Sequence, residues 1–211
     1  MDDPKEKESA YSILIMKRTV ILTGFILMVV LQWFIPGRMI FFKERVLSEG
    51  TEYRFRTEPF DPYDAFRGKY IHLAFNQATV QLKDSANWNQ GEMIFALLST
   101  DSSGYAMVTE LRKEEPEEDV DYLKVISGYV YEDSTSTSVS ISYPFDRFYM
   151  EESKAQAADD AYHQALSDTS KVTYALVLVH QGEGIVKEVY IDGVPIKKIA
   201  IERQKLEEEV Q

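Results

Sequence analysis

Cysteine is absent from the sequence, and there are only 3 histidines among its 211 residues. Without cysteine the protein can form no disulfide, no thiolate zinc site and no cysteine nucleophile, although this absence does not identify a compartment. The histidines, His72, His163 and His180, follow neither the H-x-H nor the H-E-x-x-H spacing that metal sites use. The sequence therefore predicts no metal and no cofactor.

Basic residues are also scarce. Lysine and arginine number 23 against 35 aspartates and glutamates, which gives a net charge of −12. A nucleic-acid partner needs clustered Lys and Arg to neutralise its phosphates, so we expect no nucleic-acid binding. The 13 tyrosines and 11 phenylalanines would be absent from a disordered polyanion, and they indicate that the acidity belongs to a folded surface.

Long hydrophobic runs are limited to one. Residues Thr19 to Ile35 read TVILTGFILMVVLQWFI, and as a helix they cover about 25 Å, the short end of what crosses a bilayer. Lys17 and Arg18 precede the run, and a Pro-Gly-Arg sequence follows it. At 45% hydrophobic residues, the protein is too polar for several spans. We predict one transmembrane anchor over residues 19–37, in contact with membrane lipid through residues 19–35.

Three other interpretations of this run compete with the anchor. A cleaved signal peptide would have small residues of the A-x-A kind after the run, whereas this run ends in Gln-Trp-Phe-Ile-Pro-Gly-Arg-Met. A buried core helix usually carries a polar stripe, and an amphipathic surface helix requires one. Because the run has no such stripe, the sequence favours the spanning anchor.

Basic residues on the two sides of the anchor give its orientation a slight bias. The positive-inside rule favours a cytoplasmic N-terminus when the excess precedes the span. We predict a single-pass protein of the cell (inner) membrane, with a short tail over residues 1–18 in the cytoplasm and an extracytoplasmic C-terminal domain. The basic residues before the span are Lys5, Lys7, Lys17 and Arg18, and those after it are Arg38, Lys43 and Arg45.

Beyond the anchor, the sequence predicts a juxtamembrane helix over residues 38–50, a β-rich domain over 51–201 and a charged tail over 202–211. The tail is expected to be a frayed helix or a solvated end. Alternating apolar and polar residues indicate strands with one wet face, whereas the continuous apolar run 172–179 predicts a central strand. Alanines recur on one face of residues 151–166 and predict a packed helix there. The predicted fold class is mainly β (α+β), with an N-terminal transmembrane helix followed by an antiparallel β domain with one packed helix.

The most unusual segment runs from Asp61 to Phe75 and reads DPYDAFRGKYIHLAF. An Asp before a Pro favours turn initiation, and Gly68 can adopt a positive φ that releases the backbone into a strand. Asp64 and Arg67 come within ion-pair reach if the segment forms one helical turn. The segment is therefore predicted to be a polar turn followed by a strand.

This segment resembles the GDYXXLXY protein family, whose signature is D-P-x-D-x-x-R-G-D-Y-x-x-L-x-Y. Lys69 stands where the family has Asp, and Phe75 stands where it has the last Tyr. The difference at Lys69 reverses a charge, so no role of that acid carries over to this protein. The matching residues are Asp61, Pro62, Asp64, Arg67, Gly68, Tyr70 and Leu73.

Two later regions also look like the family. They are Pro144–Glu152, before the predicted helix, and the stretch from Val177 to Val194, so the resemblance covers most of residues 20–195. It implies a membrane-anchored, extracytoplasmic domain of uncharacterised function. Family members are often encoded near multi-pass membrane proteins, which implies a partner in a membrane complex. The resemblance supplies no reaction.

The motif has both a functional and a structural interpretation. As a site, it would line a pocket that binds a ligand; as a structural turn, an Asp64–Arg67 pair and an Asp61 cap would hold the loop. His72 could serve as a general base, but no Asp or Ser partner is visible from its spacing, so we predict no catalytic residue. The candidate binding residues are Asp61, Asp64, Arg67, Gly68, Tyr70 and His72.

Two other chemical interpretations are less favoured. The acidic residues from Glu114 to Asp121 lack the Asp-x-Asp-x-Asp-Gly pattern of a calcium loop, so we expect a solvated hairpin loop. A membrane-anchored β domain is also similar to signal peptidase, which uses a Ser–Lys pair. Ser48, the first serine after the span, lacks the Met-x-Pro context expected after that nucleophile.

Together these features favour a non-enzymatic, membrane-anchored accessory domain that binds another, multi-pass, membrane protein or an envelope protein. The alternative is an envelope enzyme or a small-ligand-binding domain with its site at the Asp61–Tyr70 motif. A passive tether is the third interpretation.

Overall fold

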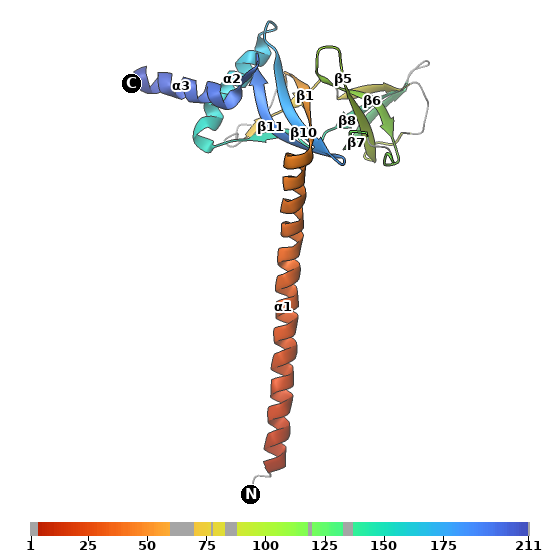
Figure 1. Ribbon diagram of the computed structural model, residues 1–211, viewed down its shortest axis with the longest axis vertical. Coiled ribbons are helices and arrows are strands. Elements are labelled where there is room, and N and C mark those ends of the chain that lie inside the picture. Colours follow the sequence, from red (N-terminus) through yellow and green to blue (C-terminus); the bar gives the residue numbers. More distant parts are fainter. Residues whose placement is uncertain are drawn as a thin grey trace. The chain divides into compact units, whose positions relative to one another are not determined.

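A computed structural model of the protein describes residues 4–59, 70–76, 78–82, 88–117, 120–132 and 137–210. The protein forms two compact units, residues 1–44 and residues 45–211. The first is helical, and the second is a domain of antiparallel sheets with helices packed against them (Figure 1). This architecture confirms the predicted fold class.

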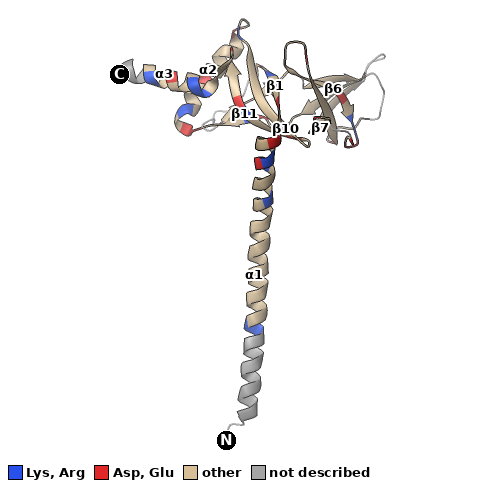
Figure 2. Ribbon diagram, viewed as in Figure 1, with Lys and Arg blue, Asp and Glu red and all other residues tan. Residues whose placement is uncertain are grey.

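Helix α1 extends from Pro4 to Glu49 and contains the predicted anchor. Its apolar side chains are exposed: Phe25 is 59% exposed and Trp33 is 75% exposed. Figure 2 shows a long uncharged stretch in the middle of this helix. The described segment Lys17–Glu49 is long and apolar enough to cross a membrane, which fits a single-pass anchor or a signal sequence.

The backbone of α1 continues through Pro36 to Glu49 as a single helix. The sequence predicts that the chain continues beyond the span as a juxtamembrane helix, and residues 38–49 are helical. Its last turn belongs to the second unit, in which Val46 is fully buried. Gly50 then ends the helix by donating its N–H to the carbonyl of Val46 at 3.0 Å.

The first sheet of the domain has the strand order β12-β11-β10-β1-β3, and its neighbouring strands are antiparallel. β10 lies in its centre and is buried on both faces, as its continuous apolar sequence predicts. In β1, buried Tyr53 and Phe55 alternate with exposed Arg54 and Arg56. The strands are β1 (Thr51–Glu58), β3 (Ala74–Phe75), β10 (Thr173–His180), β11 (Glu183–Ile191) and β12 (Val194–Pro195).

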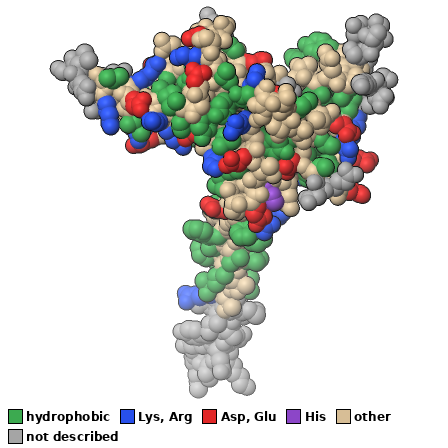
Figure 3. All heavy atoms as spheres, turned by 45° about the horizontal axis from the view of Figure 1, so that its top comes forward, with side chains coloured by type: hydrophobic (Ala, Val, Ile, Leu, Met, Phe, Trp, Pro, Cys, Tyr) green, Lys and Arg blue, Asp and Glu red, His purple; other side chains and the backbone are tan. Residues whose placement is uncertain are grey.

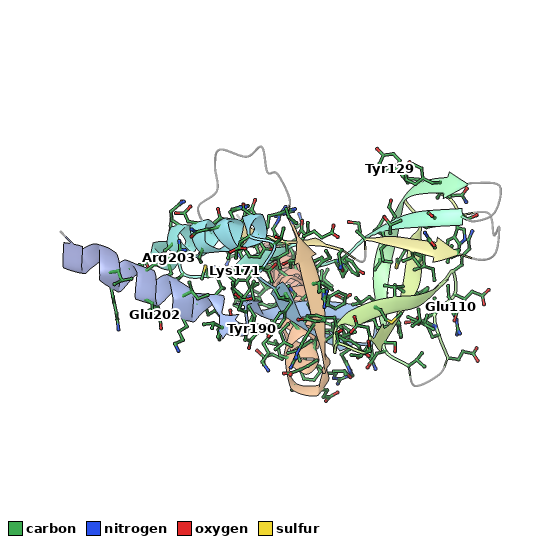
Figure 4. All side chains as sticks on the ribbon, turned by 90° about the horizontal axis from the view of Figure 1, so that it is seen from above. Glu110, Tyr129, Lys171, Tyr190, Glu202 and Arg203 are labelled. Carbon is green, nitrogen blue, oxygen red and sulfur yellow. The ribbon has the colours of Figure 1, made fainter. Side chains whose placement is uncertain are left out.

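The second sheet has the order β4-β8-β7-β5-β6 and is also antiparallel. Its edge strands β4 and β6 contact each other, so the sheet curls back on itself. Figure 4 shows Tyr129 of β7 pointing away from this sheet. The strands are β4 (Thr79–Leu82), β5 (Met93–Thr100), β6 (Ala106–Arg112), β7 (Tyr122–Glu132) and β8 (Thr137–Ser142).

The two sheets share one core that is rich in aromatic rings. Phe55 contacts Phe75, Tyr143 and Phe145 edge to face, with ring centroids 5.4–5.7 Å apart. Gly184 of β11 makes room for this cluster, since a Cβ there would lie 2.4 Å from the ring of Phe145. Such edge-to-face contacts add to the free energy gained from burial alone.

Two helices pack together beside the first sheet. α2 (Glu152–Ser167) confirms the predicted helix, and α3 (Ile196–Val210) is a second packed helix that the sequence did not predict. Ile196 and Ala200 of α3 are fully buried, and Arg203 donates to Gln164 of α2 at 2.7 Å (Figure 4). The buried residues of α2 are Ala155, Ala158, Ala161, Tyr162 and Ala165.

Candidate functional site

The motif singled out from the sequence is only partly described. Asp61, Asp64, Arg67 and Gly68 lie outside the described residues. The described part begins at strand β2 (Tyr70–His72), which carries both remaining candidates, Tyr70 and His72. Tyr70 and His72 are two positions apart on this strand, so their side chains lie on the same face of it.

Strand β2 pairs antiparallel with β9 (Arg147–Tyr149). Tyr70 lies opposite Tyr149, and His72 lies opposite Arg147. Just beyond the pair, the N–H of Leu73 donates to the carbonyl of Asp146 at 2.8 Å. The described part of the motif, from Tyr70 onward, therefore pairs with the later segment 144–152, which the sequence treated as a separate similarity.

The β2–β9 pair has one buried face and one outward face, on which Tyr70 and His72 are half-buried and Arg147 and Tyr149 are exposed. Ile71 and Phe148 point into the core, with 0% and 3% of their surface exposed. Because side chains alternate along a strand, their neighbours must point outward. We call the outward set the β2–β9 surface; it consists of Tyr70, His72, Arg147 and Tyr149, together with the adjoining Asp146.

Arg147 lies at the centre of the β2–β9 surface. Its guanidinium carbon is 5.0 Å from the centroid of the Tyr70 ring, and the rings of Tyr70 and Tyr149 are 5.7 Å apart. A hydrogen bond with Tyr149 raises the pKa of Arg147, and the charge of Asp146 at 3.6 Å raises it further. Arg147 is thus a permanent cation that lies over the ring of Tyr70 and beside the carboxylate of Asp146.

His72 has a weaker electrostatic partner. Its Nδ1 is 3.9 Å from Oδ2 of Asp146, which is within ion-pair reach but longer than a hydrogen bond. Arg147 competes for the same carboxylate at 3.6 Å. The distance between His72 and Asp146 is longer than the roughly 2.6–3.2 Å between the heavy atoms of an aligned acid–base pair.

A polar cluster that the sequence did not indicate lies behind β2, where α2 contacts both β2 and β10. The hydroxyl of Thr57 donates to that of Thr173 at 2.8 Å, and His163 lies 3.5 Å from Asp159. Tyr162 is 1% exposed, and this burial raises the pKa of its hydroxyl. The helical spacing of Tyr162 identified its buried face, but only the fold brings the two threonines together.

Two described residues of the acidic segment before β7, Glu115 and Asp121, bond to side chains of the β domain. Glu115 accepts a hydrogen bond from Tyr122 at 2.6 Å and pairs with Lys124 at 3.0 Å. Asp121 accepts one from Tyr53 at 3.0 Å. No group of three or more His, Asp or Glu side chains in the described part of the protein is arranged to hold a metal ion.

Comparison with known proteins identifies one family. The model of the family described as "GDYXXLXY protein" matches residues 32–189, most of the sequence. No curated protein and no solved structure matches it. The matched range includes both strands of the β2–β9 surface and the last residues of the apolar segment of α1.

Proposed function

Because the chain belongs to the GDYXXLXY protein family, and because a long apolar helix precedes its β domain, we propose that it is a single-pass, membrane-anchored accessory protein. Its domain binds another membrane or envelope protein and has no enzymatic activity of its own. The N-terminus lies in the cytoplasm, and the β domain lies outside the cell (inner) membrane. The slight excess of basic residues before the span supports this orientation.

The observation that carries this proposal is the pairing of β2 with β9. Two segments that resemble the family, far apart in the sequence, together present two tyrosines and an arginine outward. Tyrosine and arginine are enriched at the energetic centres of protein interfaces, where charged Lys, Glu and Asp are depleted. The surface has one acidic residue, Asp146, beside two tyrosines, a histidine and an arginine, whereas in the whole protein acidic residues outnumber basic ones by 35 to 23.

The way Arg147 is held also suits a binding role. Its cation–π contact with Tyr70 restricts the side chain before any partner arrives. Less conformational entropy is then lost on association. A planar guanidinium so positioned recognises a carboxylate through two parallel hydrogen bonds. The partner surface would therefore offer the carboxylate of an Asp, of a Glu or of its last residue.

Capture of the partner from membranes tests the proposal. The full-length tagged protein, its Arg147→Ala variant and a control Arg112→Ala variant are purified in mild detergent, and co-purifying proteins are quantified by mass spectrometry. Arg112 is a suitable control because it is an arginine of the curled sheet that bonds Glu110 at 2.9 Å (Glu110 is labelled in Figure 4). We expect a stoichiometric partner with the parent and the control, and its loss with Arg147→Ala.

Two outcomes would contradict the proposal. One is a parent protein that purifies alone, and the other is an Arg147→Ala variant that retains the partner in full. The melting temperature of each variant identifies a loss that is due to unfolding. Arg147 is on the surface, with 48% of its side chain exposed, so its truncation should leave the fold intact.

A small-ligand or enzymatic site at the Asp61–Tyr70 motif is a second candidate function. It is favoured by the proximity of His72 to Asp146, a pair that could exchange a proton after a small rearrangement. Asp61→Asn and Arg67→Lys distinguish the two candidates. If the motif is a ligand site, both variants should lose function while their melting temperatures stay unchanged. If the motif is a structural turn, both variants should have a lower melting temperature.

A further inference from the structure

Gln32 is a strongly polar residue inside the apolar segment of α1. A helical rise of 1.5 Å per residue places it about 21 Å from Arg18 and about 9 Å from Arg38, the charged residues that bound the segment. If α1 spans a membrane, as proposed above, the Gln32 amide lies within the hydrocarbon. Threonine hydroxyls in such a segment can bond a carbonyl of their own helix, but a glutamine amide has two donors and an acceptor to satisfy.

The backbone carbonyl of Gln32 also lacks its usual hydrogen-bond donor. In an α-helix the carbonyl of residue 32 accepts from the N–H of residue 36, and residue 36 is a proline inside the helix. Proline has no N–H, so this carbonyl loses its usual donor. An amide side chain and a carbonyl at the same residue therefore both need partners, where lipid offers none.

Gln32 also belongs to a regular seam along α1. Residues spaced alternately by four and three positions lie on one helix face, as in a coiled coil. Apart from Gln32, every residue of this seam is apolar and between 57% and 71% exposed. The face in Figure 3 shows hydrophobic side chains along this helix. The seam consists of Ile21, Phe25, Met28, Gln32, Ile35 and Met39.

We propose that α1 forms a parallel dimer with α1 of a second copy of this protein, with the two Gln32 residues facing each other across the seam. The amide is self-complementary: the NH₂ group of each Gln32 donates to the side-chain or backbone oxygen of the other. Two copies inserted in the same orientation bring these groups to the same depth. A single polar residue in an apolar seam fixes the register and the number of helices. The inference rests on the membrane anchoring proposed above.

Cysteine crosslinking of the full-length protein in membranes tests the dimer directly. The protein has no cysteine, so each single-cysteine variant has no background. Ile21→Cys, Phe25→Cys and Met28→Cys should form disulfide-linked species of about twice the 24.3 kDa mass of one copy on oxidation. The matched controls Val30→Cys and Phe34→Cys lie on the opposite face at 59% and 63% exposure, and they should form no disulfide crosslink even though their seam is intact.

Substitutions at Gln32 and Pro36 then test the role of the polar residue in the seam. In the Phe25→Cys background, Gln32→Leu should raise the dimer dissociation constant roughly tenfold, or about 1.4 kcal/mol, within the range of interhelical hydrogen bonds. Gln32→Asn should preserve the dimer. Pro36→Ala, which restores the donor to the Gln32 carbonyl, should weaken the dimer less than Gln32→Leu does.

The outcomes separate this inference from the proposed function. Equal crosslinking on both faces, no crosslinking of membrane-embedded protein, or an unchanged dimer in Gln32→Leu would overturn the dimer. None of these affects the partner capture at Arg147. Release of the protein from the membrane by alkaline carbonate would overturn the anchor and the dimer together.

Discussion

The guanidinium of Arg147 lies over the ring of Tyr70, with its central carbon 5.0 Å from the ring centroid. The two residues come from strands far apart in the sequence and are brought together by the pairing of β2 with β9. This contact makes an exposed surface from the two segments in which the sequence resembles its family. The other face of the same strands is a structural part of the core, and mutations can separate the two roles.

Leu73 and Tyr70 belong to the same motif but should respond differently to mutation. Leu73 is 2% exposed and packs in the core, so Leu73→Ala should lower the free energy of unfolding by about 2–5 kcal/mol. Tyr70→Phe retains the ring that faces Arg147 and should cost less than about 0.5 kcal/mol. Urea unfolding of both variants tests this difference. If both variants lost the same unfolding free energy, Leu73 and Tyr70 would not differ in their contribution to the core.

Gly184 should tolerate a methyl group poorly. A Cβ at Gly184 would lie 2.4 Å from the Phe145 ring, which the surrounding aromatic cluster holds in place. We expect Gly184→Ala to destabilise the domain by about 1–3 kcal/mol, the usual cost of overpacking. Gly128→Ala is the matched control, since its Cβ would meet the hydroxyl of Ser140, which can rotate. A control as destabilised as Gly184→Ala would contradict this account.

The Tyr53–Asp121 hydrogen bond should make stability depend on alkaline pH. Burial, aided by the hydrogen bond and charge of Asp121, raises the pKa of Tyr53 from 10.0 to about 12. The unfolded state therefore loses this proton first as the pH rises. The stabilisation is fully present below pH 10 and is lost between pH 10 and about 12.

Denaturant unfolding between pH 8 and pH 12 measures this effect. The slope of the unfolding free energy against pH above pH 10 should be smaller for Tyr53→Phe than for the parent, because that variant has no proton to lose at this position. Tyr129→Phe is the control, since Tyr129 is 65% exposed, and it should leave the profile unchanged. Parallel profiles for Tyr53→Phe and the parent would rule out this contribution.

The orientation of α1 in the membrane can be read with reporters fused after Gln211. At this position, a reporter that works only outside the cytoplasm should be active. A reporter that works only in the cytoplasm should be inactive. The reason is the excess of basic residues before the span, which favours retention of the N-terminus. The opposite pair of activities would place the β domain in the cytoplasm.

Several elements were predictable because their local patterns are strong. Alternation of apolar and polar residues in β1, the continuous apolar run of β10 and the alanine face of α2 each match the structure. A frayed helix from Glu202 was one expectation for the tail, but the start of α3 at Ile196 and its packing were missed. The charged half of α3 dominates its pattern, while only a few residues such as Ile196 and Ala200 are buried. The pairing of β2 with β9 was also missed, because register between distant strands is set by tertiary contacts.

The sequence by itself determined the long apolar helix, the mainly β domain after it and the family, since hydropathy and periodicity are properties of neighbouring residues. Only the tertiary structure decided which residues share a surface. It buries Leu73, Phe75 and Ile71 and turns Tyr70 outward beside Arg147. The physical reason is that pairing between distant strands is set by tertiary contacts. The alternation of the motif separates Ile71 and Leu73 from Tyr70, but it cannot show that Arg147 lies beside Tyr70.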